Sequence, residues 1–290
     1  MKDFAGKVAV ITGAASGFGR EFARLGAQLG MKLALADIQA DALAATVDEL
    51  CGQGAHAFGE VVDVSQAADV ERLARRTIDE FGALHLLFNN AGVAAGGLVW
   101  ENSLEDWTWV LGVNLWGVIH GVRTFVPIML AQGNECHVVN TASVAGLLSP
   151  QLMGIYNVGK HGVVTLTETL YQDLRVTGAR VGVSLLCPAF VPTGIAQSHR
   201  HRPAALRSAA APTASMIAAQ KASEKAVSSG RISAGEVARM TFDAIRENRF
   251  YVITHPKIIA SVELRLQDVI AQRNPGDPFS FAPKVAPRPR

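Results

Sequence analysis

The sequence predicts one α/β domain of the Rossmann type, a doubly wound parallel sheet of seven strands with helices on both faces. Short β-branched runs alternate with helix-length segments along the chain, as they do in repeated βαβ units. These runs are apolar throughout rather than at every second position, which is typical of strands buried on both faces. A glycine-rich loop follows the first run and opens the first helix.

The expected strands and helices alternate along the chain as far as residue 187. The strands are expected at Val8–Thr12, Lys32–Ala36, Ala57–Val62, Leu84–Asn89, His137–Thr141, Arg180–Cys187 and Tyr251–Thr254. The helices are expected at Gly19–Leu29, Asp41–Gln53, Ala68–Phe81, Leu104–Leu130, Met153–Thr177 and Ser233–Asn248.

Two segments break this alternation. Residues 191–230 are rich in Ala, Ser, Pro and His, and a connection of this length in a compact domain is usually a lid, a binding loop or a disordered segment. We expect a lid, within a domain that spans residues 1–255. Residues 256–290 are expected to form a C-terminal helix and a loosely ordered, proline-rich tail.

Composition excludes several classes of protein. Of 290 residues, 49% are hydrophobic and 18% are charged, which is ample for a large core, and the net charge of +2 is too small for a nucleic-acid surface. The first apolar run is strand-sized, and no stretch approaches the roughly 18 apolar residues of a membrane span. Three distant cysteines fit buried thiols in a reducing compartment. We therefore predict a cytoplasmic protein that binds neither nucleic acid nor membrane.

The loop from Thr12 to Gly19 has the composition of a phosphate-binding turn. Glycines allow a tight turn and a close approach of a pyrophosphate, and the following helix offers free N–H groups. Glycines alone are a weak signal in a chain with 27 of them, so a structural turn is the alternative. The strand before and the helix after favour a dinucleotide site. The contacts we expect are Gly13, Ser16, Gly17, Phe18 and Gly19.

An acidic residue, Asp37, stands at the end of the second expected strand. Its carboxylate can accept hydrogen bonds from the adenosine ribose and repel a 2′-phosphate. We expect both Asp37 and Ile38 to contact the cofactor. No cation stands at Ser16 or Ile38 to receive that phosphate, so NAD is favoured over NADP. The alternative is that Asp37 caps the helix that begins near Asp41.

A phenol and an ammonium, Tyr156 and Lys160, are spaced i and i+4 on one face of an expected helix. A free tyrosine has a pKa of about 10, and a nearby positive charge favours its ionised form. Ser143 follows the fifth expected strand, where its hydroxyl can bond a substrate oxygen. The pair alone is common; together with Ser143 and the glycine loop it indicates an acid/base group beside a nicotinamide.

At these residues the chain resembles the short-chain dehydrogenase/reductase family over nearly its whole length as far as Thr254. The resemblance is carried by Thr12, Gly13, Gly17, Gly19, Asp63, Val64, Asn89, Asn90, Ala91, Gly92, Asn114, Ser143, Tyr156, Lys160, Pro188 and Thr193. It implies that Asn114, Ser143, Tyr156 and Lys160 form the catalytic set, with Asn114 keeping a helix kinked and supporting a water beside Lys160.

The resemblance also assigns residues to the cofactor. Asp63 and Val64 would contact adenine, and Thr193 would hold the nicotinamide amide. The remaining cofactor contacts that it implies are Asn90, Ala91, Gly92, Pro188 and Val191, together with Tyr156 and Lys160. Two features depart from the pattern. Ala189 replaces the usual glycine after Pro188, and His161 follows Lys160 about 100° round the helix, so we interpret it as structural.

More narrowly, the chain is similar to bacterial Cα-dehydrogenases that oxidise benzylic alcohols in lignin-derived aryl ethers. The segments that carry this similarity are Met1–Phe4, Gly112–Leu115, Phe125–Pro127, Pro188–Ala189 and His201–Ala204. The similarity implies a bulky, aromatic secondary alcohol as substrate.

The substrate pocket is expected to be apolar, with Ser143 as its polar anchor. The residues that we expect in it are Val93, Leu98, Ser143, Leu147, Met153, Ala189, Phe190 and Ile195. His199 and His201 lack a nearby carboxylate or cysteine, so no metal site is predicted. The cations of this run can receive a substrate carboxylate or face water, and water is favoured.

Three tryptophans, Trp107, Trp109 and Trp116, lie on the expected helix that continues to Leu130. This helix is apolar on several faces, and one sheet covers only one side of it. We interpret the second side as a subunit interface of a homodimer or homotetramer, which agrees with the resemblance, and give the tryptophans a substrate role only as the minor alternative.

Together these features predict an enzyme that transfers hydride between NAD and a bulky, apolar or aromatic secondary alcohol or ketone. The alternatives are an NADP-preferring ketone reductase, a family member of different chemistry such as a dehydratase or epimerase, and a cofactor-binding redox sensor without turnover. The complete set of Asn114, Ser143, Tyr156 and Lys160 argues against the sensor.

Overall fold

The computed structural model describes residues 1–208 and 210–278 and contains one parallel sheet of seven strands. The strand order is β3-β2-β1-β4-β5-β6-β7, which is the doubly wound arrangement that the sequence predicts. The strands are β1 (Val8–Thr12), β2 (Lys32–Asp37), β3 (His56–Val61), β4 (Leu86–Asn89), β5 (Cys136–Thr141), β6 (Val181–Cys187) and β7 (Tyr251–Ile253). The order reverses between β1 and β4, so a crevice opens there at the carboxyl ends of the strands.

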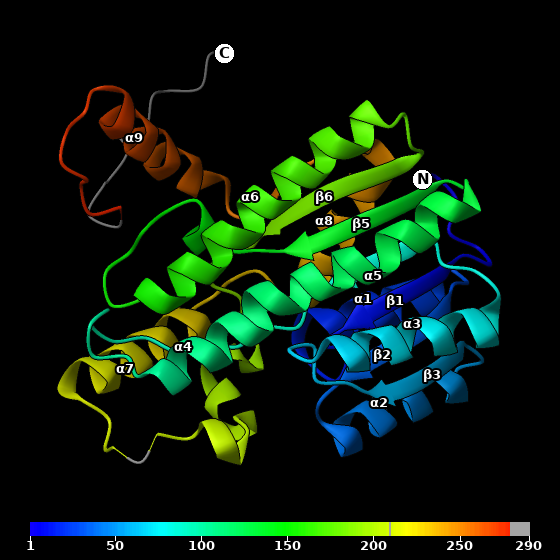
Figure 1. Cartoon of the computed structure of the whole chain (residues 1–290), viewed down its shortest axis with the longest axis horizontal. Coiled ribbons are helices and arrows are strands. Elements are labelled where there is room, and N and C mark those ends of the chain that lie inside the picture. The colour runs from blue at the N-terminus through cyan, green and yellow to red at the C-terminus, as the bar shows by residue number, and fades with distance from the viewer. Residues whose placement is uncertain (209, 279–290) are drawn as a thin grey trace.

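Helices cover both faces of the sheet (Figure 1). On one face α1 (Gly17–Gln28), α2 (Ala40–Gly52) and α8 (Ala234–Glu247) bury a core that includes Phe22 and Phe242. On the other face α3 (Ala67–Phe81), α5 (Gly117–Gln132) and α6 (Gly154–Val176) bury a core that includes Phe125 and Leu170. Because each face is covered, the strands are apolar throughout, as expected.

The long helix expected at Leu104–Leu130 is interrupted by a π-helical turn. α4 (Leu104–Leu111) leads into η1 (Gly112–Trp116) and then into α5. By length and composition, the whole helical segment Leu104–Gln132 is long and apolar enough to cross a membrane. We had expected no stretch of the chain to approach a membrane span. It packs against α3 and α6 in the layer over the sheet, so the fold explains part of its apolar composition.

The expected lid contains more regular structure than the sequence indicates. It holds the short turns η3 (Gly194–His201) and η4 (Ala204–Leu206) and the helix α7 (Ala214–Ser228), whose N-cap Thr213 accepts a hydrogen bond from Met216 N. None of the residues of α7 is fully buried, so this helix lacks the apolar stripe by which helices are recognised. We missed it for that reason.

The remaining elements are short turns and a C-terminal helix. The turn η2 (Val144–Gly146) follows β5, and η5 (Pro256–Ile258) leads into α9 (Ile259–Ile270), which projects from the body in Figure 1. Residues 279–290 of the expected tail lie outside the described residues. Of the three cysteines, Cys136 and Cys187 are buried and unpaired, but Cys51 is exposed, so our expectation of three buried thiols was wrong there.

Gly121 on α5 tests how closely this helix must approach the sheet. A Cβ there would lie within bonding distance of the Asn89 side chain, which is buried and donates to Asn140 Oδ1 at 2.9 Å. Gly121→Ala is therefore expected to lower the free energy of unfolding by about 2 kcal/mol or more. In urea unfolding, Gly52→Ala is the control, since a Cβ at Gly52 meets nothing within 4 Å. Equal effects of the two variants would contradict this account.

Candidate active site

A cleft of about 1110 Å³ runs across the carboxyl edge of the sheet. Its walls come from the glycine loop, the segments that follow β2 to β6, the α4–α5 helix and the lid. Its position is the crevice that the reversal of strand order predicts. The volume slightly exceeds the usual range for ligand pockets, roughly 300–1000 Å³, so the cleft has room for a dinucleotide and a second molecule.

The glycine loop fits a phosphate group. Gly13 and Gly17 have φ of +67° and +52°, and a Cβ at Gly13 would lie 2.9 Å from Ala91 Cα. Ser16, the N-cap of α1, makes no side-chain hydrogen bond to the helix, so the first turn keeps free N–H groups. Gly19 does not line the cleft; a Cβ there would collide with Gly13 O, so this glycine keeps the loop closed on itself.

Asp37 is buried at the end of β2 and connects two backbone segments. Its carboxylate accepts from Ala15 N and from Gln39 N, each at 3.0 Å. It thus orders both the glycine loop and the turn into α2, whose N-cap is Gln39 rather than Asp37. Ile38 beside it lines the cleft as expected. Each of its oxygens accepts one of these bonds, and a carboxylate oxygen can accept a second, so Asp37 retains capacity to bind a ribose hydroxyl.

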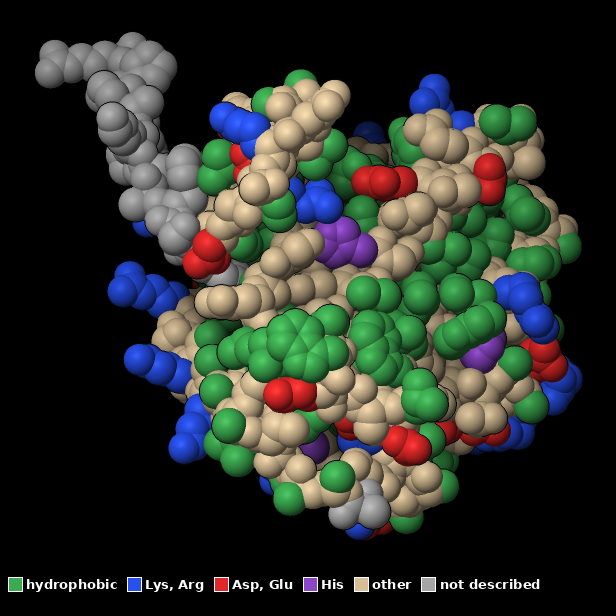
Figure 2. Space-filling view, turned by 60° about the vertical axis from the view of Figure 1, so that its left-hand side comes forward, with side chains coloured by type: hydrophobic (Ala, Val, Ile, Leu, Met, Phe, Trp, Pro, Cys, Tyr) green, Lys and Arg blue, Asp and Glu red, His purple; other side chains and the backbone are tan. Residues whose placement is uncertain are grey.

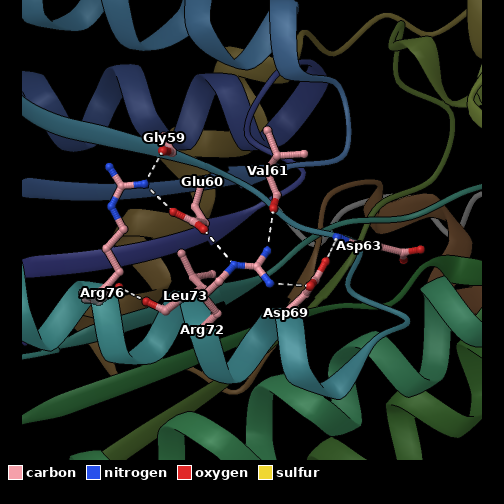
Figure 3. A network of polar contacts seen from close by, with 9 residues as sticks. Gly59, Glu60, Val61, Asp63, Asp69, Arg72, Leu73 and Arg76 are labelled. Atoms are coloured by element: carbon pink, nitrogen blue, oxygen red, sulfur yellow. Dashed lines mark hydrogen bonds and ion pairs between the residues drawn. The ribbon is translucent and has the colours of Figure 1, made fainter.

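Asp63 and Val64 line the cleft next to a network of arginines and carboxylates (Figure 3). Asp69 on α3 accepts from Asp63 N at 3.0 Å, and Arg72 donates to Asp69 and to Val61 O. The bond from Arg72 holds the pKa of Asp69 below its usual range, against the effect of burial. The network joins α3 to β3 by charged hydrogen bonds and fixes the backbone at Asp63.

Asn114 lies in the π-helical turn and is completely buried. Its Oδ1 accepts from Val93 N and its Nδ2 donates to Val93 O, both at 2.8 Å. The extra residue of a π turn aims this amide at the segment after β4. Asn114 therefore clamps the backbone of the Asn90–Val93 wall, and the helix is irregular here, as the resemblance implied.

Three side chains converge at the opposite end of the cleft from Asp37. Ser143 Oγ donates to Pro188 O at 3.3 Å and accepts from Ala145 N at 3.1 Å. Lys160 Nζ donates to Thr141 O at 2.8 Å and lies 5.8 Å from the ring centroid of Tyr156. Tyr156 is one turn of α6 before Lys160, so β5 and α6 hold the three groups together.

Burial dominates the electrostatics of this pair. It raises the pKa of Tyr156 to about 12, while hydrogen bonding with Ser143 acts to lower that pKa. Burial also lowers the pKa of Lys160 to about 8. Within the polypeptide Tyr156 is therefore a neutral acid, and burial opposes the ionised form that we expect nearby positive charges to favour.

His161 does not line the cleft. Its Nδ1 donates to Asn157 O at 2.9 Å, and its Nε2 is buried without a described partner. Desolvation lowers the pKa of His161. These contacts fit the structural role that we inferred from its position on the helix.

The predicted substrate residues separate into two groups. Val93, Ser143, Ala189 and Ile195 line the cleft, whereas Leu98, Leu147, Met153 and Phe190 do not. The structure adds Val227 to the lining, together with residues for which a substrate role was only a minor alternative or a property of the lid: Trp107, Trp109, Arg200, His201 and Leu206. Trp109 was interpreted as an interface residue, but it is buried and packs with Ile155 and Leu206. The signal that we missed is its spacing from Asp106 and Val110, which places the three residues on the buried face of α4.

The lid is fastened to the segment between β4 and α4 and to α4 itself. Ser198 Oγ accepts from Ala94 N at 2.9 Å, and Thr213 and Ser215 both donate to Glu101. Arg202 forms an ion pair with Asp106 at 2.5 Å and lies over the Trp109 ring. Our preference for water as the surroundings of these cations was therefore wrong for Arg202. A buried carboxylate that also caps α4 holds it.

No group of three His, Cys, Asp or Glu side chains in residues 1–208 and 210–278 is arranged to hold a metal ion. His199 and His201 thus have no third ligand in the described part of the lid.

Comparison with known proteins identifies relatives over the whole fold. The family model described as short chain dehydrogenase matches residues 7–204. A CLA biosynthesis dehydrogenase/reductase of Lactiplantibacillus plantarum is 33% identical, covering 95% of this chain and 97% of that protein. A C alpha-dehydrogenase of Sphingobium sp. strain SYK-6 is 34% identical, covering 93% of this chain and 87% of that protein. The narrower similarity to such enzymes is thereby confirmed.

Among solved structures, a short chain dehydrogenase/reductase from Burkholderia phymatum in complex with NAD is 61% identical to this chain. The TM-score is 0.95, and the match covers 97% of this chain and all of that one. The cradle formed by Gly13, Gly17 and Asp37 fits the nicotinamide dinucleotide that this neighbour binds.

The burial of Lys160 predicts a pH-dependent contribution to stability. Because its folded pKa is about 8 against an ordinary 10.5, the unfolded chain holds more protons between these values, and stability rises with pH. The free energy of unfolding of the wild type minus that of Lys160→Met is expected to increase by roughly 3 kcal/mol from about pH 7 to about pH 10.5. Urea unfolding measures it, with exposed Lys221→Met as control. A difference that does not change with pH would contradict the prediction.

Proposed function

The chain belongs to the short-chain dehydrogenase family, and from that premise we propose that it is an NAD-dependent enzyme that interconverts a bulky, apolar secondary alcohol and its ketone. One observation carries the proposal. Ser143, Tyr156 and Lys160 converge at one end of a cleft whose other end is a glycine loop with an acidic residue behind it. A protein that only bound the cofactor would need the loop but not the buried phenol and ammonium.

The residues of the cleft have distinct tasks in this reaction. NAD supplies the nicotinamide carbon that accepts the hydride in oxidation and, when reduced, donates it. Ser143 donates its hydroxyl hydrogen bond to the substrate oxygen. Tyr156 takes the alcohol proton in oxidation and returns it in reduction. A positive nicotinamide ring beside the phenol favours its ionised form and opposes the burial that raises the pKa of Tyr156.

Lys160 and Asn114 act by position. Lys160 Nζ is held by Thr141 O, which leaves two of its hydrogens for a ribose hydroxyl and for a water. Asn114 uses its amide on Val93, so it fixes the wall after β4 that faces the cofactor. We assign Asn90, Ala91, Gly92, Pro188, Val191 and Thr193 to the same binding surface, since all of them line the cleft.

We infer a preference for NAD from Asp37. Its buried carboxylate is fixed by Ala15 N and Gln39 N, close to where the adenosine ribose would lie. A 2′-phosphate there would meet a negative charge that cannot move away. The NAD complex of the neighbour from Burkholderia phymatum supports this assignment.

The walls beside Ser143 support a bulky apolar substrate. Val93, Ile195 and Leu206 supply aliphatic surface, and Trp107 and Trp109 add aromatic surface. Such a pocket binds apolar groups well and discriminates among them weakly. We assign residues 191–230 as the lid that completes it, within a catalytic domain of residues 1–255.

We also propose a homodimer or homotetramer. Figure 2 shows a broad band of apolar side chains on one face of the molecule. Exposed apolar residues of α4, η1, α5 and α6 include Leu104, Trp116, Leu130 and Val158. Contiguous apolar surface of this kind is typical of protein interfaces.

Replacement of Tyr156 tests the reaction class. Tyr156→Phe keeps the ring but removes the proton-transfer group, so kcat should fall by about 10²–10⁴-fold while NADH binding changes little. The control is Tyr171→Phe on the same helix, whose ring contacts Phe250 away from the cleft. Steady-state rates and NADH fluorescence titration measure the two effects. Undiminished turnover in a folded Tyr156→Phe enzyme would exclude the assignment, and wild-type NADH binding without turnover of any alcohol would favour a sensor.

Replacement of Asp37 tests the choice of cofactor. Asp37→Asn removes the charge but keeps an oxygen that accepts a backbone hydrogen bond. The ratio of kcat/KM for NAD to that for NADP is expected to fall at least about tenfold, which corresponds to roughly 1.4 kcal/mol. Asp41→Asn, an exposed change in the first turn of α2, is the control. A wild type that already prefers NADP would overturn the inference.

A further inference from the structure

We propose that the substrate carries a carboxylate in addition to its secondary hydroxyl, and that Arg200 and His201 of the lid bind this carboxylate. The substrate class is thus an apolar hydroxy acid or keto acid rather than a neutral alcohol. The inference rests on the proposed function, because it concerns the second anchor of the same pocket.

The charges that line the cleft are divided between its two ends. The acidic residues of the lining are Asp37, which ends β2, and Asp63, which follows β3, and both lie at the end that we assign to adenosine. The lid contributes Arg200 and His201 and, among its described residues, no carboxylate to the lining. A neutral apolar substrate gives these cations no partner, whereas an anionic one does.

Arg200 has donors to spare. Its Nε reaches Gln197 O of its own turn at 3.4 Å, and no ion pair of Arg200 occurs in the described part of the chain. The two terminal nitrogens of a guanidinium form a fork that matches the two oxygens of a carboxylate. Arg202, two residues on, differs in its charge partner, because its Nη1 is paired with Asp106 of α4, although its Nε and Nη2 are buried without a described hydrogen-bond partner.

The backbone on both sides of the two cations is fixed. Ser198 is buried and bonded to Ala94 N at 2.9 Å, and Arg202 is held by Asp106 and the Trp109 ring. Residues 199–201 therefore form a short span between two anchors. A fixed span lowers the entropy cost of bringing two side chains to one ligand, which is the condition for a binding site rather than a solvated turn.

The surroundings match an amphipathic ligand. Trp107, Trp109 and Leu206 line the same cleft as Ser143 and the solvent-exposed Arg200 and His201, so apolar and cationic groups face one cavity. A ligand with a hydroxyl at one end, an apolar body and a carboxylate at the other satisfies all three regions at once.

A matched series of substrates tests the proposal. Hydroxy acids with four to ten carbons between a secondary hydroxyl and the carboxylate are compared with their methyl esters. For the best member we expect the wild type to prefer the acid by about tenfold or more in kcat/KM. The preference should arise mainly in KM and should weaken as NaCl is raised.

The variants are Arg200→Gln and His201→Gln, with Arg207→Gln as the control. Arg207 is an exposed cation of the same lid that does not line the cleft. Arg200→Gln is expected to lower the acid-to-ester preference about tenfold and His201→Gln to lower it less, while Arg207→Gln leaves it unchanged. The tryptophans of the wall give a second readout, because decanoate should quench their fluorescence at lower concentration than methyl decanoate, and only in proteins that keep Arg200.

Three results would overturn the proposal. The first is oxidation of the esters with no preference for any acid of the series, which leaves the proposed function intact. The second is a preference that survives in Arg200→Gln or falls equally in Arg207→Gln. The third is that Arg200→Gln raises the KM for NAD rather than the KM for the acid, which would assign Arg200 to the cofactor phosphates. Failure to oxidise acids and esters alike would instead reject the proposed function and this inference with it.

Discussion

A buried ammonium is the feature on which the active end of the cleft depends. Lys160 lies in α6 with its Nζ out of water, and a charge in that position is tolerated only with hydrogen-bond acceptors in place. Thr141 O at the end of β5 is the acceptor. This bond fixes the rotation of α6 over the sheet and therefore places Tyr156 beside Ser143. The burial that makes this acceptor necessary also lowers the pKa of Lys160.

The cofactor end depends on a different constraint, which is the close approach of backbone segments. Gly13 and Ala91 are so near that a Cβ at position 13 would not fit, and Asn114 ties Val93 to the π-helical turn. Asp37 holds the glycine loop from the other side. Each contact joins elements that lie far apart in the sequence but meet at the reversal of strand order. The wall is therefore rigid before any ligand arrives.

Features with a local signal could be predicted from the sequence. Strand β1, the glycine loop and the Tyr156–Lys160 pair are encoded within a few residues, and so is the capping that starts α8. Features that depend on distant partners could not be. The contact of Arg202 with Asp106 and the burial of Trp109 follow from how the lid lies over α4. Helix α7 was missed because it has no buried face, and Leu98, Leu147, Met153 and Phe190 were assigned to the pocket by composition alone.

This division explains why reaction and substrate are specified by separate parts of the chain. The reacting groups lie on strands and helices whose packing leaves them little freedom, since a shift of α6 or β5 would leave the buried ammonium of Lys160 without its hydrogen-bond acceptor. The lid is attached by polar contacts at Ser198, Arg202 and Glu101 and buries few side chains of its own. Changes of sequence between these anchors alter what the pocket accepts while leaving the proton and hydride chemistry in place. Arg200 and His201 lie in such a span, which is why a substrate-specific contact is expected there rather than on the sheet.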